Sequence, residues 1–366
     1  MSDPRIAKLA KVLVHYSLEL KPGQQFEIRT HPLAEELTLA IYEEAVKAGV
    51  NTSIKTSTPG ADEIFFQYAS DAQLDYISPT NKLVMETYDA VQTIWCDHNT
   101  RALSAIDPTR MAHYSKTNAP VFTTFLNRTA NKDMRWCGTA YPTEANAQEA
   151  DMSLASYREF VYTAGKLNED DPVAHWVKVG REQQKLVDWL GGHDQVTLKG
   201  SNVDLKMSIK DRIFISCDGK ENFPDGEIFT GPVEDSVNGW VRFRYPAIQH
   251  GLEVTDIQLW FEHGKVVKET ASKNQEFLTA QLNADPGARY LGEFGIGTNY
   301  GITRFTKNML FDEKMGGTVH LAVGAGLPET GSVNESGIHW DMLCDMSDAE
   351  IRVDSDLFYK DGKPVI

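Results

Sequence analysis

The chain has 366 residues, 41% hydrophobic and 24% charged, which is typical of a soluble globular protein long enough for two domains. Its formal net charge of -16 repels phosphate backbones, and no local basic patch is visible, which argues against nucleic acid as a partner. The four cysteines are scattered without a C-x-x-C pair, which argues against a disulfide framework or a thiolate zinc site and favours a cytoplasmic setting.

The first residues predict an amphipathic helix rather than a signal peptide. Pro4 follows Asp3 at its start, and Lys8 and Lys11 interrupt the apolar positions. No apolar stretch in the chain is long enough to span a bilayer, so no membrane association is expected.

Helical and extended patterns then alternate through the N-terminal part. Residues 26–30 alternate as a strand, and 31–49 predict a helix that begins near Pro32 and stops at Gly49. Further strands are predicted over 51–57, 90–96 and 120–125. This alternation indicates an α/β architecture with a mostly parallel sheet.

The pattern changes twice after this region. Two helices are predicted, over 144–165 and 171–192, with a break near Pro172. Beyond residue 190, short alternating runs predict strands over 195–200, 203–209, 212–219, 239–245 and 254–261, with one helix over 272–285. We therefore expect an α/β N-terminal domain over residues 1–190 and a β-rich α+β metal-binding domain over residues 191–366.

The stretch "NESGIHWDML" places His339 and Asp341 two residues apart. In a β-strand both side chains would project from one face and Trp340 from the other, because strand side chains alternate with period two. In "TVHLAV", His320 likewise faces away from its apolar neighbours. Such side chains either bind a metal or belong to an edge strand with a solvated face.

Glu227 and Glu293 add two carboxylates, each directly after a glycine. A divalent cation can stabilise several buried carboxylates and imidazoles at once, and oxygen and nitrogen ligands without thiolate suit zinc, cobalt, manganese or iron. Taken singly, such a glutamate is usually a turn or surface residue, and such a histidine is usually hydrogen-bonded. Compact signatures such as H-E-x-x-H, G-x-S-x-G and the P-loop are absent, so spacing alone leaves the metal site open.

Four stretches, read in order, carry a family resemblance: "GEIFTGPVEDSVNG", "LGEFGIGTN", "NMLFDEKMGGTVHLAVG" and "PETGSVNESGIHWDM". They resemble the thermophilic aminopeptidase family of metallopeptidases, the aminopeptidase T and aminopeptidase S group. The resemblance covers the second domain, and the α/β first half agrees with it. It implies a cytoplasmic homodimer that removes N-terminal amino acids from peptides with two divalent metal ions, zinc or cobalt, with manganese, magnesium or iron also compatible.

Carried over position by position, the resemblance also implies the residues of the site. One acidic residue, Glu313, is implied as catalytic, acting either as a metal ligand or as the general base. The implied metal ligands are Glu227, Glu293, His320, His339 and Asp341.

One position departs from the family pattern. The family usually has a tyrosine before "PETG", placed to assist the reacting carbonyl, whereas this chain has Leu327. Leucine donates no hydrogen bond, and loss of one such donor typically lowers turnover about 100- to 1000-fold. Tyr300 is a candidate for a replacement donor.

Two other functions are compatible with these residues. His320, His339 and Asp341 are also the ligand inventory of a mononuclear non-haem iron dioxygenase, and a dihydroxypyridine ring-cleaving enzyme is similar to this peptidase fold. The third possibility is a dimeric binding protein that keeps a metal only for structure. Two zinc- or cobalt-like ions per chain would support the peptidase, and one iron the oxygenase.

Overall fold

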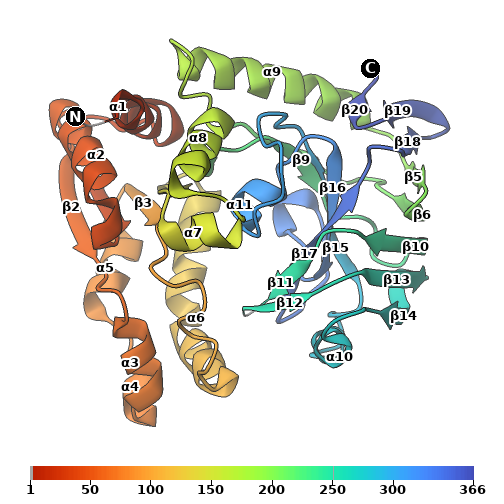
Figure 1. Cartoon of the computed structure of the whole chain (residues 1–366), viewed down its shortest axis with the longest axis horizontal. Helices are drawn as coiled ribbons and strands as arrows, with labels where there is room; N and C mark the ends of the chain where they lie inside the picture. The colour runs from red at the N-terminus through yellow and green to blue at the C-terminus, as the bar shows by residue number, and fades with distance from the viewer. Residues whose placement is uncertain (1–2, 250) are drawn as a thin grey trace. The chain divides into compact units, whose positions relative to one another are not determined.

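The computed structural model describes residues 3–249 and 251–366, which divide into two compact units (Figure 1). The first contains the described residues up to Val173 together with Gly219–Pro224, and the second contains Ala174–Asp218 and Asp225–Ile366. The helix α9 (Pro172–Leu190), which we placed in the first domain, therefore groups almost entirely with the second unit.

The first unit is built on a parallel sheet of five strands in the order β2-β1-β3-β4-β8. Its fifth strand comes from the short segment that returns from the second unit. The fold class predicted for this part of the chain is confirmed. The strands are β1 (Gln25–Thr30), β2 (Asn51–Thr56), β3 (Ala90–Trp95), β4 (Arg135–Ala140) and β8 (Asn222–Phe223).

Helices connect these strands, and the sequence explains how the first one begins. The Asp3 carboxylate accepts a hydrogen bond from the backbone N–H of Arg5, and Pro4 occupies the first turn, where its missing N–H has no consequence. The remaining α-helices of this unit are α2 (Glu35–Lys47), α3 (Ala61–Tyr68), α4 (Asp71–Leu74), α5 (Pro79–Thr87), α6 (Pro108–Ala130), α7 (Glu144–Glu149) and α8 (Leu154–Ala164), after α1 (Pro4–Lys11).

The strand predicted over residues 120–125 is wrong, because these residues lie inside α6. Their β-branched and aromatic composition favours a strand locally, but tertiary packing overrides that preference. Val121 and Phe125, one helical turn apart, belong to an apolar cluster that α6 forms with residues of α5 and β3.

The single helix predicted over 144–165 is also interrupted. Asp151 adopts a left-handed conformation with φ of 53°, which ends the first helical segment. Ser153 then caps α8 by accepting a hydrogen bond from the backbone N–H of Ser156. The interruption thus follows from local capping chemistry.

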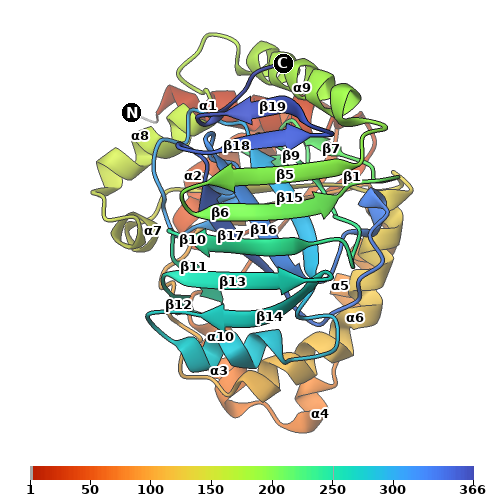
Figure 2. The same cartoon turned by 90° about the vertical axis from the view of Figure 1, so that its right-hand side faces the viewer.

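In the second unit an eight-stranded sheet packs against a five-stranded sheet, and both contribute to one large hydrophobic core (Figure 2). The five-stranded sheet is antiparallel in the order β17-β16-β15-β9-β7. Its strands are β7 (Ile215–Cys217), β9 (Glu227–Thr230), β15 (Leu291–Gly297), β16 (Thr318–Gly324) and β17 (His339–Asp345).

The eight-stranded sheet has the order β14-β13-β10-β6-β5-β18-β19-β20. It contains β5 (Gln195–Gly200), β6 (Val203–Ser208), β10 (Asn238–Phe243), β13 (Ile257–Glu262), β14 (Lys265–Thr270), β18 (Glu350–Val353), β19 (Asp356–Lys360) and β20 (Lys363–Pro364). The unit is completed by the hairpin of β11 (Ala247–Gln249) and β12 (Leu252–Val254) and by α10 (Gln275–Leu282) and α11 (Met309–Asp312). The β-rich second part was predicted correctly.

Alternation along the five-stranded sheet gives its two faces different characters. One face supplies large apolar residues to the core, including Phe294, Ile296, Leu321, Val323 and Trp340. At its centre the opposite face carries the small residues Gly295, Gly297, Ala322 and Gly324. Small residues leave room above that face for side chains that project from the surrounding positions.

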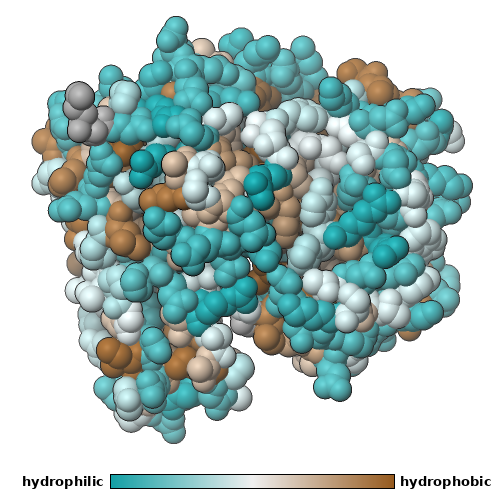
Figure 3. Space-filling model, in the orientation of Figure 1, coloured by the Kyte–Doolittle hydropathy of each residue, from teal (hydrophilic) through white to brown (hydrophobic). Residues whose placement is uncertain are grey.

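The surface agrees with the ordinary composition of the chain. The face shown in Figure 3 is mostly hydrophilic, with only scattered hydrophobic residues. Among the described helices, none combines the length and the apolar character needed to cross a membrane.

Candidate metal centre

The register of the five-stranded sheet places all five predicted ligands on one face. Residues directly opposite each other in an antiparallel pair project to the same side. Each predicted ligand is paired directly with one of the small residues. The pairs are Glu227 with Gly297, Glu293 with Ala322, His320 with Gly295, His339 with Gly324 and Asp341 with Ala322.

An irregularity in β15 aims Glu293 at this face. Leu291 pairs with Val323 and Glu293 with Ala322, so one extra residue, Gly292, is inserted between the two pairs. In a regular strand, residues two positions apart project from the same face. The extra residue lets Leu291 face the core while Glu293 projects from the opposite face. A Cβ atom at Gly292 would lie 2.2 Å from the carbonyl oxygen of Ala325, so only glycine fits there.

The carboxylate of Glu293 lies between two imidazoles. Its Oε1 is 3.1 Å from His320 Nε2, and its Oε2 is 3.1 Å from His339 Nε2. Each imidazole also faces a second carboxylate, since Glu227 Oε2 is 3.4 Å from His320 Nε2 and Asp341 Oδ2 is 3.6 Å from His339 Nε2. We call Glu227, Glu293 and His320 the first ligand group and Glu293, His339 and Asp341 the second ligand group.

Backbone carbonyls fix the orientation of both imidazoles. His320 Nδ1 donates to the carbonyl oxygen of Glu313 at 3.0 Å, and His339 Nδ1 donates to that of Ala325 at 2.8 Å. Because a carbonyl oxygen only accepts, Nδ1 carries a proton in each ring, and Nε2 is left to bind a cation. Each Nε2 lies within hydrogen-bonding reach of a carboxylate oxygen, so a positive species, either a proton or a metal ion, must sit between them.

These distances fit a divalent metal ion. In a tetrahedral site with bonds of about 2.0–2.1 Å, neighbouring ligand atoms lie about 3.3 Å apart. The four distances between imidazole Nε2 and carboxylate oxygen atoms span 3.1–3.6 Å. In addition, Oε2 of Glu227 is buried without a hydrogen-bond partner, as expected for an oxygen that binds a cation. The ligand atoms of the second group all lie within 4.8 Å of one another.

The acidic surroundings control the charge of the two histidines. Burial alone lowers the pKa of His320 and of His339, but hydrogen bonds to Glu293 and the neighbouring carboxylates outweigh it and raise each pKa to about 10. Conversely, burial raises the pKa of Glu293, but its hydrogen bonds to the two imidazoles lower it to about 2. The surrounding carboxylates therefore stabilise a positive charge on each imidazole, as they would stabilise a metal ion beside it.

The flanking carboxylates behave differently. Burial raises the pKa of Glu227 to about 7, against the opposing charge of Lys314. Burial likewise raises the pKa of Asp341 to about 6, although the charge of His339 opposes it. Both carboxyl groups consequently hold their protons more tightly than free carboxylic acids, so a proton competes more strongly with a metal ion for each of them.

The predicted catalytic residue, Glu313, directly follows α11, and its side chain is partly exposed. Its carboxylate contacts the ammonium of Lys314, a residue that sequence reasoning missed. Lys314 Nζ also lies 3.4 Å from Glu227 Oε1 and 3.9 Å from Oδ1 of Asp225, the second missed residue. Asp225 could have been noticed from its position two residues before Glu227, whereas a buried lysine gives no sequence signal because lysine is almost always exposed.

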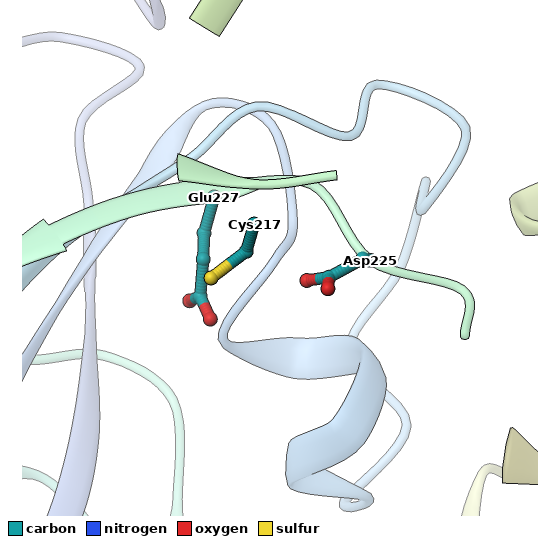
Figure 4. Close-up of side chains that lie close together, drawn as sticks. All are labelled: Cys217, Asp225 and Glu227. Atoms are coloured by element: carbon teal, nitrogen blue, oxygen red, sulfur yellow. The ribbon is translucent and has the colours of Figure 1, made fainter. Parts of the chain in front are cut away.

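Cys217, Asp225 and Glu227 form another cluster of potential ligands, with one ligand atom of each within 4.8 Å of the others. Figure 4 shows the thiol of Cys217 beside the carboxylate of Glu227, with the carboxylate of Asp225 directed toward them. The ammonium of Lys314 is already near both carboxylates, so a positive charge from within the protein partly compensates this cluster.

Leu327, which departs from the family pattern, and Tyr300, the candidate replacement donor, lie in different settings. Leu327 is half-buried and precedes a short 3₁₀ turn, Pro328–Thr330. The hydroxyl of Tyr300 donates to the carbonyl oxygen of Gly362 at 3.0 Å. Tyr300 therefore already uses its hydroxyl proton in a structural hydrogen bond.

Sequence comparisons identify related proteins along nearly the whole chain. Residues 2–363 match the family described as thermophilic metalloprotease (M29). Aminopeptidase 2 of Geobacillus stearothermophilus is 25% identical, with 99% of this chain and 95% of that protein aligned. Aminopeptidase T of Thermus thermophilus is also 25% identical, covering 98% of this chain and 95% of that protein.

Two solved structures share the fold. Wild-type AmpT from Thermus thermophilus superposes with a TM-score of 0.86 at 21% identity, covering 99% of each chain. A 2,5-dihydroxypyridine dioxygenase from Pseudomonas putida superposes with a TM-score of 0.55 at 12% identity, covering 100% of this chain and 98% of that one. At such identities the superpositions show similarity of fold alone, and the first is much the closer of these two.

Proposed function

The chain belongs to the thermophilic metalloprotease (M29) family and is a metallo-aminopeptidase, and we propose that the two ligand groups together with Glu313 form its catalytic centre. The family resemblance of the sequence motifs and the convergence of these side chains on one face of a sheet support this assignment. The reaction releases N-terminal amino acids from peptides.

The observation that carries the proposal is the position of Glu293. Each of its two carboxylate oxygens lies 3.1 Å from a different imidazole Nε2, so Glu293 would be a ligand shared by the two groups. The outer carboxylates, Glu227 and Asp341, would then give each ion a ligand of its own. Nitrogen and oxygen ligands suit zinc or cobalt, with manganese, magnesium or iron also compatible.

Two divalent ions in this centre would polarise the scissile carbonyl and lower the pKa of an attacking water. Glu313 is the best placed acidic residue to act as the general base, because its side chain is partly exposed while its backbone carbonyl orients His320. It would take a proton from the attacking water and return it to the leaving amine nitrogen. The acidic surroundings would also favour the positively charged N-terminus of a peptide.

The remaining features of the proposal come from the family resemblance. We propose a cytoplasmic homodimer that acts on peptides, without nucleic acid or membrane partners. The scattered cysteines and the formal net charge of -16 support the compartment and the lack of nucleic-acid binding.

The iron dioxygenase alternative explains the site less completely. A facial triad of His320, His339 and Asp341 would leave Glu293 unused, although Glu293 contacts both imidazoles. It would also leave Glu227 Oε2 buried without a partner. The fold similarity to a dioxygenase at 12% identity does not offset these two points.

Metal reconstitution tests the proposal. The protein is freed of metal with a chelator, reloaded with zinc, cobalt, manganese, magnesium or iron, and assayed with a panel of aminoacyl reporter substrates. We expect two ions per chain and release of N-terminal amino acids that the chelator abolishes, with Glu293→Gln as the inactive control. One iron per chain, with no hydrolysis under any metal, would contradict the proposal.

A further inference from the structure

We propose that Lys314 is a positioning residue of the metal centre, whose buried ammonium binds one oxygen of Glu227 and thereby directs the other oxygen toward the metal position beside His320. This inference rests on the proposed function, because it concerns how the first ligand group binds its ion. Lys314 itself is fully buried and has no contact with solvent, so it acts through Glu227 and Glu313.

The burial of Lys314 requires an explanation. Its side chain has 0% exposure, and a buried ammonium is strongly unfavourable unless several acceptors surround it. An ammonium has three N–H donors, and three carboxylates lie around it. These are Glu227 at 3.4 Å, Asp225 at 3.9 Å and Glu313 in direct contact.

The two oxygens of Glu227 have different neighbours. Oε1 lies 3.4 Å from Lys314 Nζ, whereas Oε2 lies 3.4 Å from His320 Nε2 and has no hydrogen-bond partner. Because the ammonium is next to Oε1, a metal ion would be repelled from that oxygen and would bind Oε2 alone. Lys314 therefore makes Glu227 a ligand through one defined oxygen atom.

Residues 313 and 314 together orient the first ligand group. The backbone carbonyl of Glu313 accepts the hydrogen bond from His320 Nδ1, and the next residue, Lys314, lies against Glu227. One short segment after α11 thus orients both Glu227 and His320, the two members of this group other than Glu293. The described contacts of the second ligand group do not include Lys314, so that group serves as an internal comparison.

The ammonium also explains why Cys217, Asp225 and Glu227 should not bind a further ion. Their ligand atoms are close enough for a cation, as Figure 4 shows, but Lys314 already supplies one positive charge there. The centre and its surroundings contain five carboxylates against the one ammonium of Lys314. These are Asp225, Glu227, Glu293, Glu313 and Asp341. The four remaining negative charges match two divalent ions, with both histidines neutral.

Cobalt titration of the metal-free protein tests this inference without relying on turnover. The visible absorption of bound Co²⁺ reports both the number of ions and their coordination geometry. We expect two ions in the wild-type protein. In Lys314→Met we expect a 10- to 100-fold weaker affinity at the first ligand group, the usual effect of losing a partner that orients a ligand, and an unchanged affinity at the second ligand group.

Two further variants control for a merely structural effect. Lys307→Met removes another lysine of the same unit, which pairs with Glu253 at 3.1 Å, and should bind both cobalt ions as the wild type does. Lys314→Arg keeps the positive charge and should recover affinity at the first ligand group. Equal affinities of Lys314→Met and wild type for both ions would overturn the inference, as would equal losses at both positions.

A second pair of variants covers the case in which Lys314→Met alone does not fold. Glu227→Gln and the double variant Glu227→Gln/Lys314→Met should bind cobalt alike, because position 227 no longer has a carboxylate for Lys314 to direct. A further tenfold loss on adding Lys314→Met would overturn the inference. A wild-type protein that binds no divalent ion would instead defeat the proposed function, so the two failures are distinguishable.

Discussion

Replacing Gly295 by alanine should remove one metal ion while leaving the second unit folded. A Cβ atom at this position would lie 2.0 Å from both Cε1 and Nε2 of His320. Since non-bonded carbon atoms relax at about 3.5 Å, the imidazole would have to retreat by roughly 1.5 Å. A metal–nitrogen bond of about 2.0–2.1 Å tolerates only about 0.2 Å of displacement, so His320 could no longer serve as a ligand.

The stability change should be smaller than the change in metal binding. Overpacking of this kind costs about 1–3 kcal/mol, which a domain with a core of this size should survive. Metal content by atomic emission and thermal unfolding in chelator measure the two effects separately. Gly191→Ala is the matched control, because its added Cβ would meet only an ordinary contact, 3.4 Å from the Asp188 carbonyl oxygen. Two ions bound to Gly295→Ala with wild-type affinity would refute the reasoning.

Three further predictions follow from the same geometry. Glu293→Gln should lose both metal ions and Glu227→Gln only one, because Glu293 faces both imidazoles. Equal metal content in the two variants would rule out a shared ligand. Metal affinity should rise as the pH increases toward 10, because the two site histidines, each with a pKa raised to about 10, must lose their protons before they bind metal. Cobalt titrations that give the same affinity at every pH would contradict this prediction. Tyr300→Phe should destabilise the protein by about 1 kcal/mol, because the hydrogen bond to Gly362 is lost, and should leave kcat unchanged. A large fall in kcat would instead identify Tyr300 as a substrate contact.

Periodicity predicted the parts of the fold in which local pattern and tertiary burial agree. The alternation of His339, Trp340 and Asp341 is an example, since Trp340 is in the core and its neighbours are on the site face. The segment 120–125 is the opposite case, because a β-like composition is used in a helix whose apolar stripe packs against the sheet.

The candidate site was predictable only in part, for physical reasons. Ligand types and their spacing along each strand are visible in the sequence, but which strands become neighbours is not. The bulge at Gly292 and the buried Lys314 were invisible, because each depends on contacts between segments far apart in the chain. Such contacts are set by packing rather than by local preference.

The distribution of the ligands over β9, β15, β16 and β17 has a consequence for the synthesis of the protein. A ribosome adds about 5–20 residues per second, so β17 emerges roughly one to four seconds after β16. During that interval the nascent chain carries every ligand of the first group, Glu227, Glu293 and His320, but neither the histidine nor the aspartate of the second. In the proposed two-metal centre, the ligands of the first group are thus all synthesised before the histidine and aspartate of the second group.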